Sequence, residues 1–357
     1  MNELEVVRRR MATQRLSAEG LGSPADVVRL LGAVQAQEFA EVKWSLAERM
    51  AGEPTDAEIG AAFDRGEIIR THVLRPTWHF VAPEDLRWML ELTAPRIQQA
   101  IGYHCSQIGL DQRTLRRGGE VVAAALASGE PMLRKELGAV LATAGIEVEG
   151  PALGLVAMHA EVEGLICSGP LRGRQHTYAL LDHRVPPTPD LTRDQALSEL
   201  ARRYFLGHGP ATVRDFSWWS GLKMADSRQA VETVGDELSR EEGADGTAWF
   251  GPGAAPPPPR AGAHLIPMYD EVGVAYKDLR MVYAEPPPEG AMARPILIEG
   301  VTVGSWKRTI ERREARLEAT LFTSLGKAKL KALEGAAERF GRFLEMPIRL
   351  ETRSATG

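Results

Sequence analysis

The order of apolar and polar positions predicts three stretches of the chain that share one plan. In each stretch, short helices with an apolar face are followed by two β-rich runs joined by a tight turn. We expect these stretches at residues 1–83, 112–186 and 190–251. Helices followed by a hairpin are typical of a winged helix. The pattern therefore predicts an α+β, mainly helical fold with three tandem winged-helix modules.

The first stretch shows the pattern most fully. Ser23 and Pro24 favour a helix start, because a capping side chain precedes a proline at the first helical position. The expected elements are helices near residues 24–33, 42–49 and 56–65, and strands at 68–73 and 77–81 joined through Leu74-Arg75-Pro76.

The other two stretches repeat this plan, and a helical connector at residues 84–111 is expected between the first and the second. The second has helices near 112–127, 131–143 and 150–164, then a hairpin with its turn at 169–174. The third has helices over 192–206, 211–220 and 224–234, then weaker strands near 237–240 and 247–250.

The remainder of the chain predicts a linker and an α/β region. Residues 251–259 contain a run of four prolines, which favours a stiff loop. Residues 260–357 are expected to complete the scaffold, with strands at 294–298 and 301–307 and a helix at 325–343.

Composition excludes some classes of protein. With 357 residues, 44% of them hydrophobic and 25% charged, the chain is typical of a soluble protein with two or three cores. No apolar run reaches the roughly 18–20 residues that span a bilayer, so we expect a cytoplasmic protein without a membrane partner. Cys105 and Cys167 lack metal-ligand spacing, and we expect neither a metal nor another cofactor. The net charge of −5 argues against a protein that coats DNA, and confines any DNA binding to a local basic face.

The helices that would enter a DNA groove are poorly suited to reading bases. Residues 151–163 are apolar and acidic, and residues 224–236 set Arg228 among Asp226, Glu232 and Asp236. Base-reading helices carry Arg, Asn, Gln or Lys. A transcription regulator, which would also be a dimer on a two-fold operator, is therefore the less favoured alternative.

Basic side chains lie on turns and flanks instead. Arg172 and Arg174 occupy a glycine-flanked hairpin tip with His176 beside them, which is typical of a finger that enters a groove or follows a backbone. For His79, packing inside the protein remains an alternative to a contact with DNA. The expected DNA contacts are Arg172, Arg174, His176, Arg75, His79, Arg116 and Arg117.

A pair of glutamines, Gln35 and Gln37, is the first candidate for chemistry. On a regular helix residues two apart point about 200° from each other, so these amides converge only if the helix ends before them. Two surface amides are the alternative. Glu38, the nearest carboxylate, is expected to be solvated or paired with Lys43. Elsewhere in the chain, Asp270 and Glu271, as neighbours on a strand, are expected to be structural.

The chain resembles the winged-helix DNA glycosylase family typified by AlkZ and YcaQ, over nearly its whole length. The residues that carry the resemblance are Gln35-Ala36-Gln37, the block Arg70 to Phe80, and Pro267 to Glu271 with Tyr276-Lys277-Asp278. The resemblance implies three winged helices in a C-shaped arrangement, with Gln35 and Gln37 as the catalytic Gln-x-Gln motif. It also implies excision of bulky N7-alkylguanines and unhooking of cross-links, and a DNA-probing hairpin that we place at residues 169–175.

A glutamine pair suits this chemistry. A carboxamide is no base at neutral pH, but it donates and accepts hydrogen bonds and can orient water. Alkylation at N7 makes guanine a cation, so the base leaves as a neutral molecule and water captures the sugar cation. Positioning then matters more than general-base strength.

The leading hypothesis is a monomeric, monofunctional DNA glycosylase whose partner is double-stranded DNA carrying alkylated bases. A noncatalytic DNA-binding regulator and a protein-interaction scaffold remain as alternatives. Because a bulky adduct does not fit a closed pocket, we expect an open cleft over the DNA.

Overall fold

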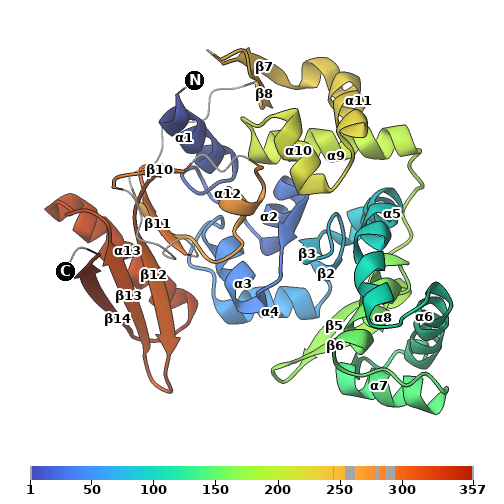
Figure 1. The fold of residues 1–357 in the computed structure, drawn as a ribbon. Coiled ribbons are helices and arrows are strands. Elements are labelled where there is room, and N and C mark those ends of the chain that lie inside the picture. Colours follow the sequence, from blue (N-terminus) through green and yellow to red (C-terminus); the bar gives the residue numbers. More distant parts are fainter. Residues whose placement is uncertain (1, 244, 254–261, 278–280, 286–293, 356–357) are drawn as a thin grey trace.

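The computed structural model describes residues 2–243, 245–253, 262–277, 281–285 and 294–355, and Figure 1 shows their arrangement. Residues 254–259 of the linker expected at 251–259, and the motif residue Asp278, lie outside the described residues. The described chain mixes helices with four separate sheets, which confirms the predicted α+β class.

The first block of elements follows the helix α1 (Glu3–Thr13) and lies at the centre of the molecule (Figure 1). It consists of α2 (Pro24–Leu31), β1 (Ala33–Gln35), α3 (Phe39–Ala47), α4 (Asp56–Asp64), β2 (Ile69–His72) and β3 (Trp78–Val81). The Ser23 side chain accepts a hydrogen bond from the Asp26 amide and so caps α2, as predicted. The sheet order β1-β3-β2 is antiparallel. The short strand β1 was not predicted.

The second block has the same order of elements and is reached through the 25-residue helix α5 (Pro83–Gln107). It consists of α6 (Gln112–Leu126), β4 (Met132–Leu133), α7 (Arg134–Thr143), α8 (Gly150–Val162), β5 (Ile166–Arg172) and β6 (Gln175–Leu180). Its sheet, in the order β4-β6-β5, matches that of the first block, and the predicted hairpin is confirmed.

The third block repeats the order once more in a reduced form. It consists of α9 (Arg193–His208), α10 (Val213–Ser220), α11 (Met224–Val234), β7 (Ser239–Glu242) and β8 (Ala248–Gly251). An isolated bridge between Ala211 and Phe250 takes the place of the first strand. A short 3₁₀ helix at Leu181–His183 follows the second block, and another at Gly235–Glu237 precedes β7.

The C-terminal region is a larger sheet with one helix packed on it. The strand path is β14-β13-β12-β11-β9, and β10 pairs with β12. The elements are β9 (Ala263–Leu265), α12 (Glu271–Val274), β10 (Val282–Tyr283), β11 (Pro295–Ile298), β12 (Val301–Ile310), β13 (Ala315–Leu321), α13 (Lys327–Phe343) and β14 (Ile348–Ser354). We had expected Asp270 and Glu271 to lie on a strand, and this prediction was wrong. Asp270 caps the short helix α12, and Glu271 begins it.

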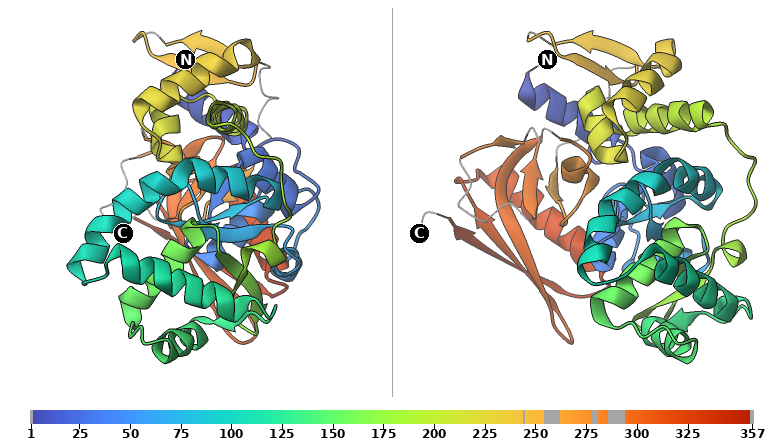
Figure 2. Two further views of the ribbon diagram at one scale, coloured as in Figure 1. Left: turned by 90° about the vertical axis from the view of Figure 1, so that its right-hand side faces the viewer. Right: turned by 45° about the vertical axis from the view of Figure 1, so that its right-hand side comes forward.

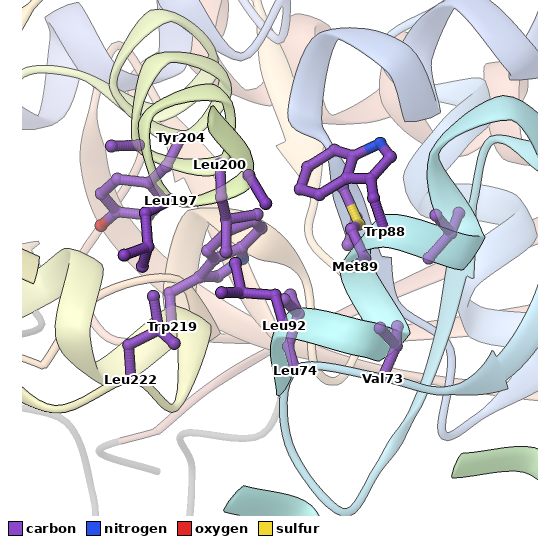
Figure 3. Close-up of a cluster of buried hydrophobic side chains, with 14 of the residues drawn as sticks. Val73, Leu74, Trp88, Met89, Leu92, Leu197, Leu200, Tyr204, Trp219 and Leu222 are labelled. Carbon is purple, nitrogen blue, oxygen red and sulfur yellow. The ribbon is translucent and has the colours of Figure 1, made fainter. Parts of the chain in front are cut away.

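Apolar contacts fix the other parts around the first block. Trp44 of α3 packs against Phe340 and Phe343 of α13, with ring centroids 5.0 and 5.1 Å apart. Leu74 and α5 share a core with the third block (Figure 3), and the C-terminal half of α5 packs against the second. Figure 2 shows the C-terminal sheet and the second block approaching the first block from different sides. The hairpins β5–β6 and β12–β13 both extend into the lower part of the view in Figure 1, from opposite sides of the space below α3.

Candidate active site

Gln35 is the last residue of β1 and is only 7% exposed. Its backbone N–H donates to Oε1 of Glu271 (2.7 Å), and its side-chain Oε1 accepts from Nη2 of Arg75 (3.1 Å). The helix α2 ends at Leu31, and Gly32 at a φ of 73° turns the chain into the strand. The helix break that the glutamine pair requires is therefore confirmed, and the main chain and amide of Gln35 are both anchored.

Gln37 lies in the loop after β1 and is half-buried. Arg70 donates from Nε to the carbonyl of Ala36 (3.0 Å) and from Nη2 to that of Gln37 (3.5 Å). The guanidinium of Arg70 also lies 4.3 Å from the centre of the Trp78 ring. Burial lowers the pKa of Arg70 to about 10, so it remains a cation at neutral pH. Arg70 therefore holds the main chain of the loop, while no hydrogen bond to a described residue holds the Gln37 amide.

Glu271 is the buried carboxylate behind Gln35, and it has no exposed surface. Its Oε2 accepts from Nε1 of Trp219 (3.1 Å) and lies 3.3 Å from Nε2 of His208. The neighbouring Asp270 forms a buried ion pair with Arg49 (2.7 Å). Both carboxylates are engaged inside the protein, which fits the structural role expected for them, and Glu271 additionally positions Gln35.

A cleft of about 830 Å³ opens on the Gln37 side, between the hairpin β5–β6 and the strand β12. We call it the basic cleft. Its lining includes Lys43, Arg70, Arg134, Arg174 and Arg308, with Glu38 and Asp56 as the carboxylates. Cations thus outnumber acids here, although the whole chain carries a net charge of −5. The cleft is therefore a local basic face of the kind that DNA binding by this acidic chain needs.

A second pocket, of about 710 Å³, opens on the Gln35 side, and we call it the aromatic pocket. Its aromatic residues are Trp218 (45% exposed), Tyr269 (40% exposed) and the buried Tyr276. Its further lining includes Gln35, Arg75, Pro76, Thr77, Ile266, Pro267, Met268, Val272, Gly273, Val274, Met281 and Pro295. Gln35 and Gln37 therefore line different pockets, and the sharing of one water by both amides stays a prediction.

Two of the predicted DNA contacts, Arg174 and His176, lie in the basic cleft. Arg174 is exposed, and none of the described residues forms an ion pair or hydrogen bond with it. The His176 ring packs edge-on against Phe39 with centroids 4.8 Å apart. Burial, and then the charges of Arg70 and Lys43, lower the pKa of His176 to about 4. At neutral pH His176 is therefore an uncharged wall of the cleft.

The other predicted contacts are placed less favourably. His79 is completely buried, with Nδ1 2.9 Å from the carbonyl of Thr77, so its expected contact with DNA was wrong. Arg172 is paired with Glu136 of α7 (2.8 Å), and Arg75 is bound to Gln35. Arg116 and Arg117 are exposed on α6 and line neither pocket.

The sequence reading missed several cleft residues because their positions depend on distant parts of the chain. Lys43 is paired with Asp56 (2.6 Å) rather than with Glu38. Arg308 of β12 reaches the cleft while paired with Glu41 of α3 (2.9 Å). The basic C-terminal run was visible in the sequence, but only the sheet places its Arg308 opposite the hairpin β5–β6.

The described residues contain no group of three or more His, Cys, Asp or Glu side chains arranged to hold a metal ion. None of the described helices is both long and apolar enough to cross a membrane.

Comparison with protein families identifies the class. The family model of AlkZ-like DNA glycosylases matches residues 28–343. The chain therefore belongs to the AlkZ-like DNA glycosylase family, and it is a DNA glycosylase. This membership favours the enzyme over the regulator and the scaffold.

Among solved structures, the chain is similar to the DNA glycosylase AlkZ of Streptomyces sahachiroi. The two share 24% sequence identity with a TM-score of 0.78, over 98% of this chain and 100% of that one. At this identity the likeness shows a common fold. No curated protein sequence matches the chain.

Proposed function

We propose that this DNA glycosylase hydrolyses the N-glycosidic bond of guanine alkylated at N7, including bulky adducts and interstrand cross-links. It acts as a monofunctional, monomeric enzyme on double-stranded DNA at the nucleoid, in repair or in resistance to alkylating natural products. Three winged-helix modules, formed by the three recurring blocks, form its scaffold in a C-shaped arrangement. The likeness in fold to AlkZ supports this arrangement.

The observation that carries the proposal is the glutamine pair, in which Gln35 is anchored and Gln37 lines the basic cleft. Gln35 is held by Glu271 and Arg75, and Gln37 follows it in a loop held by Arg70. Fixed groups stabilise a transition state without reorganising during the reaction. The Gln35 amide is therefore a pre-organised neutral dipole, and Gln37 beside it lines a cleft that attracts phosphates.

The proposed chemistry needs no titrating base. The N7-alkylated base leaves with the electron pair of the glycosidic bond and becomes neutral, while the sugar becomes an oxocarbenium-like cation. Oε1 of Gln35 has one lone pair bound to Arg75 and a second one free to accept from water. A water held there attacks the sugar carbon and loses its proton to solvent.

The duplex is proposed to lie along the basic cleft. Arg174 and Lys43 contact phosphates from two sides, and Arg308 contacts them from β12. The hairpin β5–β6 at residues 169–175 is the proposed DNA-probing element, with Arg174 at its tip.

Release of the base tests the proposal directly. Duplex DNA carrying 7-methylguanine, or a nitrogen-mustard cross-link, is incubated with the protein and then treated with alkali to cut abasic sites. We expect cleavage by the wild type, and a loss of about a hundredfold or more in Gln35→Ala and Gln37→Ala. The matched control is Gln112→Ala, which removes the same amide from an exposed position on α6.

Each result of this assay has a defined meaning. Equal activity of wild type and both motif variants contradicts the assignment of Gln35 and Gln37. Failure to release either adduct while DNA is still bound contradicts the N7-guanine substrate class. A loss in Gln112→Ala as large as in the motif variants contradicts a site-specific effect.

A further inference from the structure

We propose that the aromatic pocket binds the apolar, aromatic part of the N7 substituent, and so selects which adduct the enzyme excises. This inference rests on the proposed function and adds to it a subsite with its own ligand chemistry. The ligand class is a flat apolar group attached to guanine N7.

The walls of the pocket suit such a group. Trp218 and Tyr269 expose unusually large aromatic surfaces, and Met268, Ile266 and Val272 add apolar ones. Ligand sites are typically apolar with a few convergent polar groups. Nε1 of Trp218 is already bound to the carbonyl of Val274 (3.2 Å), and the Lys277 ammonium lies over one face of the ring, 4.4 Å from its centre. The ring is therefore held, and the proposed stacking uses its other face.

The pocket is continuous with the catalytic motif. Gln35 and Arg75 form part of its wall, and they are the residues whose amide and guanidinium are joined. A guanine whose glycosidic bond lies at Gln35 therefore directs a substituent toward Trp218. The basic cleft, on the Gln37 side, remains available for the phosphates.

Strained backbone positions occur at one residue of the pocket wall and directly before another. Tyr269 has a φ of 64°, and Leu74, which directly precedes Arg75, also has a φ of 64°. Residues other than glycine rarely adopt this left-handed conformation, and the strain persists where the surroundings impose it. The surroundings thus impose this conformation on Tyr269, whose side chain is 40% exposed in the wall of the pocket.

An unmodified base flipped from the duplex is a poorer occupant. Guanine has hydrogen-bonding edges that a base pocket must satisfy. Here Asp270 is already bound by Arg49 and Ser45, and the remaining wall is largely apolar. An apolar substituent leaves no such groups unpaired.

A filling variant tests the subsite without touching Gln35. A Cβ at Gly273, which lines the pocket on α12, meets no atom within 4 Å, so Gly273→Leu projects into open space. Gly335→Leu is the matched control, since Gly335 on α13 is also helical and equally unobstructed. Single-turnover excision of 7-benzylguanine and 7-methylguanine from the same duplex is measured with each protein.

We expect the benzyl-to-methyl rate ratio to fall about tenfold in Gly273→Leu and to stay at the wild-type value in Gly335→Leu. Trp218→Ala, which removes a stacking face, is expected to lower the same ratio. Because a ratio is measured, partial loss of folded protein cancels between the two substrates.

Other outcomes overturn the inference and separate it from the proposed function. Equal losses on both adducts in Gly273→Leu indicate a base pocket or a structural effect. An unchanged ratio in both Gly273→Leu and Trp218→Ala shows that the substituent lies elsewhere, while glutamine-dependent release still supports the proposed function. Release of neither adduct by the wild type overturns both.

Discussion

At the scale of single residues, a glutamine acts only through its orientation, because it has no proton to transfer at neutral pH. The neighbours of Gln35 therefore determine what it can do. Glu271 fixes its main chain, and Arg75 fixes its amide. Burial lowers the pKa of Arg75, yet the charge of the nearby Glu271 opposes this shift. The two anchors thus also stabilise each other electrostatically.

Replacing Arg75 tests the importance of this orientation. In Arg75→Ala the Gln35 amide can rotate, and we expect the single-turnover excision rate to fall about tenfold to a hundredfold. The affinity for undamaged duplex is expected to change little. Arg117→Ala, on an exposed arginine bound to the carbonyl of Ala144, is the control. A rate within twofold of the wild type shows that Arg75 does not position Gln35.

His176 gives a prediction about pH. Its folded pKa of about 4 lies below the unfolded value near 6.5, so the unfolded chain binds a proton first as the pH falls. The free energy of unfolding should therefore decrease between about pH 6.5 and 4. His79 and His159, whose pKa values burial also lowers, contribute in the same direction.

Thermal melts over this pH range measure the effect. His176→Phe keeps a ring against Phe39 and is expected to flatten the decrease, while excision near neutral pH keeps the same pH profile as the wild type. An equally steep decrease in the variant contradicts the lowered pKa.

At the scale of elements, the sequence predicts what local signals determine. Ser23 and Pro24 place the start of α2, and two β-rich runs around the turn at 169–174 place the hairpin of the second block. The strand β1 escapes prediction because three residues carry too little pattern. It forms because Val34 and Gln35 pair with Phe80 and His79, far along the chain.

Some residues of the candidate site could likewise be predicted from the sequence, and others could not. Resemblance to a family indicated Gln35 and Gln37, but Glu271, which holds Gln35, is 236 positions away. Arg308 reaches the basic cleft only through the sheet formed by β12 and β13. Long-range contacts of this kind leave no periodic signal in a single sequence.

The contact between α2 and α9 supplies a prediction for the elements. A Cβ at Gly207 would lie 2.3 Å from the carbonyl oxygen of Leu30, a backbone atom that cannot move freely. Gly207→Ala is therefore expected to destabilise the protein by about 1–3 kcal/mol, through separation of the two helices. Gly335→Ala, with open space around it, is expected to be neutral or slightly stabilising. Equal unfolding midpoints for the two variants, measured in urea, contradict this close packing.

At the scale of the whole molecule, the charge distribution reconciles an acidic chain with a DNA substrate. The net charge is −5, yet the basic cleft combines cations from α3, α7, the hairpin β5–β6 and β12. The first block, the second block and the C-terminal region each supply a part, so the cleft exists only when the C-terminal sheet and the second block are both packed around the first. Repulsion elsewhere on the surface then disfavours indiscriminate coating of DNA.

The salt dependence of duplex binding follows from this arrangement. The logarithm of the association constant should fall linearly with the logarithm of the salt concentration, by about 0.9 per phosphate contacted. Besides Arg70, the cations that line the cleft are Lys43, Arg134, Arg174 and Arg308, so we expect a slope no steeper than about −4 for undamaged duplex. This value is an upper limit, because Lys43 and Arg308 are already paired with Asp56 and Glu41. Arg174→Ala should reduce the steepness by about one, whereas Arg172→Ala should change it little because Arg172 is already paired with Glu136. Fluorescence anisotropy titrations at several KCl concentrations measure these slopes. Equal changes in the two hairpin variants contradict the placement of DNA in the cleft, because only Arg174 faces it unpaired.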